Sequence, residues 1–165
     1  MKAHFRMMAA YNAWANARLY TAAQVMSDEQ FRADLGAFFG SVMATLNHIM
    51  VADLLWLARF RGQPSPPLTL DQILHEDLNE LTAARKVLDE DICRFVESVS
   101  EEALEDDFTY RTASTNQEIT QNMGSALSHV FNHQTHHRGQ VHAMLTRVTG
   151  DAPALDLVFY QRDAA

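Results

Sequence analysis

Histidine is the residue type in this sequence whose number and spacing point most directly to chemistry. Eight of the 165 residues are histidine, and five of these lie close together: His129, His133, His136, His137 and His142. On a helix with 100° per residue, His137 and His133 lie roughly 40° and 80° from the direction of the apolar side chains. The other three lie roughly 100° to 140° away from it. The spacing therefore predicts that His133 and His137 face the interior or its edge, and that the other three are solvated.

Two histidines that are four residues apart on a helix can bind one metal ion. Their Cβ atoms are about 5–6 Å apart, and both rings can reach an ion at the Zn–N distance of about 2.0–2.1 Å. A buried imidazole without a metal needs hydrogen-bond partners for its ring nitrogens. A pair of core or edge histidines with such ordinary partners is therefore the alternative, and a metal site requires a third ligand from another helix.

His48 is the candidate for this third ligand. It lies in a stretch that is apolar on nearly every side of the predicted helix, where a histidine requires a reason. It lies off the apolar stripe of that helix, however, so periodicity leaves a metal ligand and an interior or interface histidine as equal alternatives. His4 and His75 have polar neighbours and are predicted to be surface residues.

Helices must position these side chains, because apolar residues recur at helical spacing along most of the chain. We expect a first helix of about two dozen residues that ends at Ser27-Asp28, and a second over 37–60. A third helix is predicted to open with a capping box at Thr69 and Gln72 and to reach Val99. A helical turn at 100–102, a hairpin or extended loop over 108–119, a fourth helix over 122–149 and a packed apolar tail at 155–160 follow. The predicted fold is all-α, a four-helix bundle formed by a single domain over 1–165.

Composition excludes several classes of function. The net charge of −8 provides no basic field for nucleic acid, and it disfavours anionic membranes. No apolar run approaches the ~18–20 residues of a membrane span, and the N-terminal residues lack the apolar segment of a secretory signal. A single cysteine, Cys93, cannot form an intramolecular disulfide. We therefore expect a cytoplasmic protein in which Cys93 is a buried, inert thiol.

Four segments resemble the DinB family of metal-dependent proteins, which is unrelated to the DNA polymerase of that name. They are 45–53 (TLNHIMVAD), 130–142 (VFNHQTHHRGQVH), 11–16 (YNAWAN) and 155–157 (LDL), of which the H-x-x-x-H-R-G-Q run is the most specific. The resemblance covers nearly the whole chain and implies a DinB/YfiT-like four-helix bundle. It also implies one divalent metal ion held by His48, His133 and His137. Proteins of this kind often form homodimers, and related branches include thiol-dependent transferases and isomerases.

Three histidine ligands with an open fourth position are typical of a catalytic metal, and imidazole suits zinc, nickel and other first-row ions. A hydrolase would use a general base, but the predicted fourth helix has no carboxylate between Glu118 and Asp151. Asp53 is predicted to form a buried pair with Arg18 instead. A metal-activated thiol needs no base, which favours a thiol-dependent transferase, with a low-molecular-weight thiol as co-substrate, over a hydrolase. The alternatives are a non-catalytic metal-binding stress-response protein and a purely structural helical dimer.

Further polar side chains are candidates for supporting roles. Gln134 and Gln140 could hold the imidazole rings from outside the ligand set. Arg138 could bind a substrate carboxylate or pair with an acidic neighbour. The cavity above the metal could be lined by Tyr11, Asn12, Trp14 and Asn16, although core packing is the favoured role of Tyr11 and Trp14.

Overall fold

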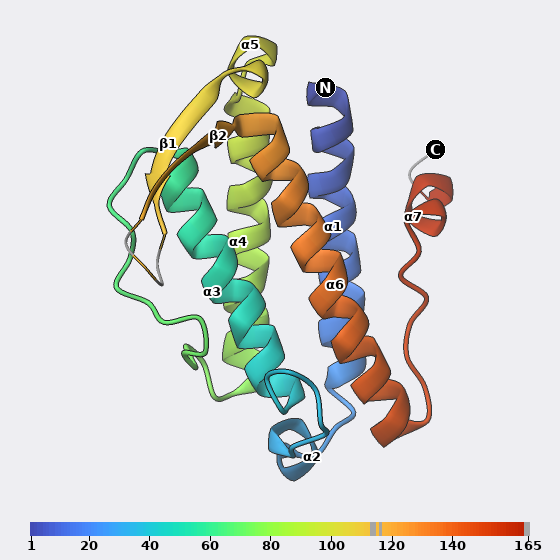
Figure 1. Cartoon of the computed structure of the whole chain (residues 1–165). Coiled ribbons are helices and arrows are strands. Elements are labelled where there is room, and N and C mark those ends of the chain that lie inside the picture. Colours follow the sequence, from blue (N-terminus) through green and yellow to red (C-terminus); the bar gives the residue numbers. More distant parts are fainter. Residues whose placement is uncertain (113–114, 116, 164–165) are drawn as a thin grey trace.

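The computed structural model describes residues 1–112, 115 and 117–163 (Figure 1). This part of the chain forms seven helices and one two-stranded antiparallel sheet. The helical character and the small hairpin agree with the sequence prediction. The elements are α1 (Lys2–Ala23), α2 (Asp28–Arg32), α3 (Val42–Phe60), α4 (Leu78–Ser98), α5 (Glu101–Glu105), β1 (Asp107–Arg111), β2 (Glu118–Asn122), α6 (Met123–Thr149) and α7 (Leu157–Asp163).

The four long helices, α1, α3, α4 and α6, lie side by side (Figure 1). Helices α1 and α3 each pack against both α4 and α6, so the edge between α3 and α6 is opposite the edge between α1 and α4. Their fully buried side chains include Leu19, Leu46, Leu81 and Leu127, which form the apolar core. No helix in the described ranges combines the length and the apolar character that crossing a membrane would require.

Helix α3 begins five residues later than the sequence predicts. Gly36 and Gly40 both have positive φ, and the amide of Gly40 donates to the carbonyl of Ala37, so this segment forms a tight turn. The helix starts after Ser41, whose Oγ accepts a hydrogen bond from the amide of Ala44. The apolar residues before Ser41 continue the helical pattern in the sequence, but in the structure they precede α3.

The predicted start of the third long helix at Thr69 is wrong. Thr69 and Gln72 do bond to each other, but they close an isolated turn. The amides of Leu74 and His75 then donate to Oδ1 of Asn47 on α3, which removes them from any helical ladder. Helix α4 starts after Asp77, whose carboxylate caps its first turn.

The later elements match the predicted ones closely. The turn at 100–102 is the start of α5, and the hairpin over 108–119 is formed by β1 and β2, in which Thr109 pairs with Thr120. Within that predicted hairpin, Ala113, Ser114 and Asn116 lie outside the described residues. Helix α6 has the predicted bounds, and it ends at Gly150 in the left-handed conformation. The tail packs as predicted, because the Tyr11 hydroxyl donates to the carbonyl of Leu155.

Candidate metal centre

Three histidines converge between α3 and α6. His48 comes from α3, and His133 and His137 come from successive turns of α6. One ring nitrogen from each lies within 4.8 Å of the other two. The imidazole centroids are 4.4 Å apart for His133 and His137, 4.6 Å for His48 and His137, and 5.1 Å for His48 and His133. The structure therefore brings together the three residues that the sequence and the family resemblance selected.

Hydrogen bonds from outside the cluster fix the orientation of two of these rings. Nδ1 of His48 lies 2.7 Å from the carbonyl oxygen of Leu70, and Nδ1 of His137 lies 2.9 Å from Oε1 of Gln140. Both oxygens can only accept, so each Nδ1 carries the proton and each Nε2 of a neutral ring presents its lone pair. The role predicted for Gln140 is confirmed by this contact.

The distance between His48 and His133 fits a shared ion. Their Nε2 atoms are 3.2 Å apart, and two nitrogens bound tetrahedrally to one zinc ion would be separated by about 3.3 Å. A direct hydrogen bond between the rings is also compatible with this distance, provided that His133 donates from Nε2. The donor set, three imidazoles with no carboxylate in the cluster, is of the kind that binds zinc and its first-row neighbours.

The surroundings of the three rings favour the neutral imidazole that a metal requires. Burial, together with the neighbouring rings of His137 and His48 when these are charged, lowers the pKa of His133 to about 3. Burial also lowers the pKa of His48 and of His137, against the hydrogen bonds to Leu70 and Gln140. All three rings are therefore available as ligands at neutral pH without loss of a proton.

Two residues that the sequence analysis did not select complete the site. Phe39 stacks on the imidazole of His48, with centroids 3.8 Å apart and planes at 22°. Leu70 contributes its carbonyl from the loop between α3 and α4. Neither contact has a sequence signal, because both residues lie in irregular segments where no periodicity indicates which way a group points.

A cavity of about 280 Å³ opens beside His48 and His133. Its other described lining residues are Ala52, Leu55, Trp56, Arg59, Leu70, Tyr110, Thr112 and His129. Tyr11, Asn12, Trp14 and Asn16 do not line it, so their predicted place above the metal is wrong. Tyr11 and Trp14 have a packing role instead, since their rings contact each other and the ring of Tyr160 on α7.

The remaining histidines lie outside the cluster. His129 and His136 are exposed as predicted, whereas His142 is half-buried. His129 packs on Trp56 at a centroid distance of 5.3 Å, and His136 accepts a hydrogen bond from Gln140. His4 is exposed, and His75 is half-buried with Nδ1 3.7 Å from a carboxylate oxygen of Glu80.

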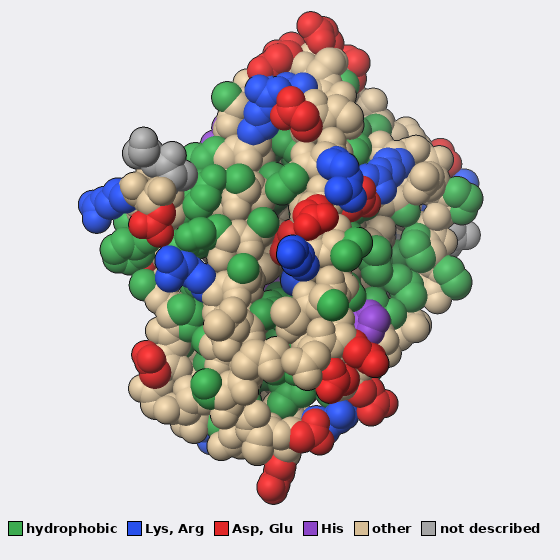
Figure 2. All heavy atoms as spheres, turned by 180° about the vertical axis from the view of Figure 1, so that it is seen from behind, with side chains coloured by type: hydrophobic (Ala, Val, Ile, Leu, Met, Phe, Trp, Pro, Cys, Tyr) green, Lys and Arg blue, Asp and Glu red, His purple; other side chains and the backbone are tan. Residues whose placement is uncertain are grey.

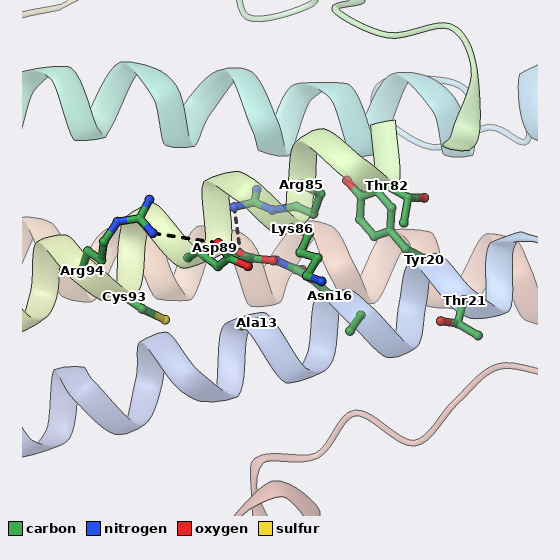
Figure 3. Close-up of a pocket in the computed structure, with 12 residues that line it drawn as sticks. Ala13, Asn16, Tyr20, Thr21, Thr82, Arg85, Lys86, Asp89, Cys93 and Arg94 are labelled. Carbon is green, nitrogen blue, oxygen red and sulfur yellow. Dashed lines mark hydrogen bonds and ion pairs between the residues drawn. The ribbon is translucent and has the colours of Figure 1, made fainter. Parts of the chain in front are cut away.

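The predicted pair between Arg18 and Asp53 is not formed. Arg18 is exposed and pairs with Asp163, whereas the buried Asp53 accepts from Nη1 of Arg85 on α4 at 2.6 Å. Arg85 also pairs with Asp89 at 2.8 Å, which is visible beside the α1–α4 cavity of about 680 Å³ (Figure 3). The sequence did not predict the pair between Asp53 and Arg85, because Arg85 lies among other charged residues of α4 and the pattern does not indicate that it is buried.

The other polar candidates join the same buried network. Gln134 donates to Asp53 and accepts from Arg138, so it does not hold an imidazole as predicted. Arg138 donates to Asn12 and Asn16, and those two amides donate to Asp89. Arg138 therefore interacts mainly with amides rather than with a carboxylate or the metal-side cavity. The half-buried Cys93 lines the α1–α4 cavity, and burial raises the pKa of its thiol, as expected of an inert cysteine.

The α1–α4 side of the molecule differs from the histidine side. Seen from behind, acidic and basic side chains alternate with hydrophobic ones, and few histidines are visible (Figure 2). The α1–α4 cavity contains none of the three converging histidines. The candidate metal centre therefore belongs to the opposite edge of the helix assembly, between α3 and α6.

Fold and site together define a helix-rich protein in which three histidines from two long helices could hold a metal ion. Residues 1–164 match the model of the DinB family, and the chain belongs to this family. It is also similar to Protein DinB of Bacillus subtilis (strain 168), with 29% identity over 153 residues that cover 87% of this chain and 85% of the relative.

Proposed function

We propose that the protein binds one divalent metal ion, zinc or nickel, through Nε2 of His48 and His137 and a ring nitrogen of His133. In this proposal the whole chain is one DinB/YfiT-like four-helix bundle that holds the site at its α3–α6 edge. The observation that carries it is the convergence of three ligand nitrogens within 4.8 Å, with Nδ1 of two rings already engaged by oxygen acceptors.

We further propose that this metal serves a thiol-dependent, S-transferase-like enzyme that acts on a small molecule. A metal with three imidazole ligands and an open position can stabilise a bound thiolate or polarise a carbonyl. The described residues that line the adjacent cavity include no carboxylate, so a hydrolase would lack the usual acidic general base there. This supports thiol transfer over hydrolysis.

The alternative is a non-catalytic metal-binding protein of a stress response. Micromolar or weaker metal affinity and a fourth position closed to added ligands would favour it. The proposed enzyme is cytoplasmic and homodimeric and has no nucleic-acid or membrane partner. The dimer follows from the family resemblance alone, and light scattering coupled to size-exclusion chromatography tests it.

Elemental analysis of the purified protein tests the metal site. The expected result is one divalent ion per chain in the wild type, lost in His48→Ala, His133→Ala and His137→Ala while circular dichroism shows an intact helical fold. His142→Ala, a change on the same helix outside the cluster, should keep the metal. A wild type that takes up neither zinc nor nickel on addition contradicts the proposal.

Cobalt substitution tests the proposed activity separately. Small thiols should change the visible spectrum of the cobalt-loaded protein by binding at the open position. An unchanged spectrum in the presence of thiols, with cobalt bound, would favour the non-catalytic alternative.

A further inference from the structure

The cavity beside the candidate metal centre extends along α3, away from the converging histidines. His48, Ala52, Leu55, Trp56 and Arg59 line it, and their spacing places them on one face of α3. Arg59 is eleven residues beyond His48, which corresponds to about 16 Å between their Cα atoms along the helix axis. Because helical side chains tilt toward the N-terminus, Arg59 reaches back into the cavity from its far end.

The opposite wall of the cavity is formed by residues of α6 and β1. His133 lies level with His48, with centroids 5.1 Å apart, and His129, one turn earlier on α6, packs against Trp56. Tyr110 of β1 lies 5.2 Å from the Trp56 ring and completes the distal end. The cavity thus has imidazoles at one end, two aromatic rings and a guanidinium at the other, and the aliphatic Ala52 and Leu55 between them.

Arg59 is held in place but has no anionic partner. Its guanidinium carbon lies 4.6 Å from the centroid of Trp56 and 5.0 Å from that of Tyr110. Its Nε is buried with no hydrogen-bond partner, and no carboxylate within the described ranges lies at ion-pair distance from it. By contrast Arg61, two residues further on, forms a bidentate pair with Asp91 at 2.9 Å.

An unpaired, half-buried arginine is unusual in a protein with a net charge of −8, because carboxylates are abundant. Burying a guanidinium without a partner costs free energy that an anion would recover. Its planar fork suits a carboxylate or phosphate, and the two aromatic rings restrict the directions from which that anion can approach.

We propose that Arg59 is a specificity-determining residue that binds an anionic group, a carboxylate or phosphate, at the end of an elongated ligand whose other end reaches the metal. This inference rests on the proposed function, since it assigns a substrate class to the same site. The ligand is a small acid with an apolar middle section that contacts Trp56 and Tyr110. If the metal-bound group is a thiolate, the ligand is an acidic thiol.

Matched acidic and neutral thiols test this assignment on the cobalt-loaded protein. The probes are straight-chain ω-mercaptocarboxylic acids of increasing length and the ω-mercaptoalcohols of the same lengths. The thiolate-to-cobalt absorption band reports binding. We expect an acid of suitable length to bind about tenfold or more tightly than its alcohol, the preference that one charge-assisted hydrogen bond provides. Arg59→Met should abolish this preference, and Arg59→Lys should retain part of it.

Two controls separate the possible failures. Arg61→Met removes a nearby arginine that already has a carboxylate partner, and it should leave the preference unchanged. Cobalt uptake in each variant reports the metal site itself, so absence of uptake contradicts the proposed function. Equal affinity for acids and alcohols with cobalt bound, or a preference that survives Arg59→Met, overturns the role of Arg59 alone.

A metal-independent measurement tests the anion site even if the metal proposal fails. In a Trp14→Phe background Trp56 is the remaining tryptophan. Phenylpropionate should change its emission in the metal-free protein at lower concentration than phenylpropanol does, and Arg59→Met should remove the difference. Identical responses to the two compounds in the protein with Arg59 would overturn the proposal.

Discussion

Single side chains outside the cluster of three histidines decide how the imidazoles are oriented toward one another. Gln140 accepts from Nδ1 of His137 and donates to Nε2 of His136. The first contact fixes the tautomer and the plane of the His137 ring, so that Nε2 points its lone pair at the other two histidines. The second holds the amide of Gln140 in the orientation that the first requires.

Gln140→Ala should therefore weaken zinc binding about 10- to 100-fold, the usual effect of removing such a partner. Competition with a chromophoric chelator measures this affinity. The helical content should not change, because Gln140 is half-buried at the edge of α6. His136→Ala is the matched control: it removes only the second contact of Gln140, and a loss of affinity as large as that of Gln140→Ala would contradict this role for Gln140.

Periodicity on α6 sufficed to select His133 and His137, because ligands that are four residues apart share a helix face. His48 could not be selected in this way, since α3 is buried on nearly every side and its periodicity does not distinguish one interior direction from another. The family resemblance supplied it. Arg59 was not found at all, because its role depends on the absence of a carboxylate partner, which becomes evident only in three dimensions.

The loop between α3 and α4 is held by one buried side chain. Asn47 accepts from the amides of Leu74 and His75, and it donates to the carbonyl oxygens of His75 and Met43. The same loop contributes the carbonyl of Leu70 that orients His48. Asn47, the residue before His48, thus holds the loop whose Leu70 carbonyl orients the His48 ring. This loop is therefore part of the site.

Asn47→Ala should lower the free energy of unfolding by about 3 kcal/mol, since it leaves two amides and a carbonyl of the loop without this partner. It should also weaken zinc binding, because the Leu70 carbonyl is no longer held against His48. Urea denaturation and chelator competition measure the two effects.

Thr45→Val is the matched control for Asn47→Ala. It removes a buried side-chain hydrogen bond to Ser41 within α3 but leaves the loop in place. It should cost less stability and leave zinc affinity unchanged. Wild-type affinity in Asn47→Ala would show that the loop does not position His48.

The start of α4 was mispredicted because of the same tertiary hydrogen bonds that hold the loop. At Thr69 the local signal was real, since the reciprocal contact with Gln72 is present, but hydrogen bonds from α3 to Leu74 and His75 prevented the helix from continuing. Such tertiary bonds cannot be inferred from periodicity. Helix α6 was predicted correctly because its cap at Asn122 and its end at Gly150 are local.

In the molecule as a whole, two sets of titratable groups respond to pH in opposite senses. Burial lowers the pKa of His48, His129, His133 and His137, and for His129 the charge of Arg59 adds to this effect. Burial raises the pKa of Asp53 to about 6 and that of Asp89, although Arg85 opposes both shifts. The histidines therefore favour unfolding as pH falls, whereas the two carboxylates favour folding.

The histidines should determine the balance in the metal-free protein. Below the ordinary histidine pKa of about 6.5 the unfolded chain binds protons that the folded state excludes, so stability is lost as pH falls. The carboxylates act in the opposite sense, and for Asp53 the effect falls between about pH 6 and its ordinary pKa of about 4. Four histidines outnumber two carboxylates and begin to titrate at higher pH.

We therefore expect the free energy of unfolding of the chelator-treated protein to fall by about 2 kcal/mol between about pH 7.5 and pH 5.5. Urea denaturation at constant ionic strength measures it. His133→Asn should reduce the dependence, because His133 has the largest pKa shift of the three converging histidines and asparagine does not titrate. Bound zinc should protect the wild type until protons displace it from the imidazoles. A free energy of unfolding that is constant or rises on acidification would show that the buried Asp53 and Asp89 outweigh the histidines.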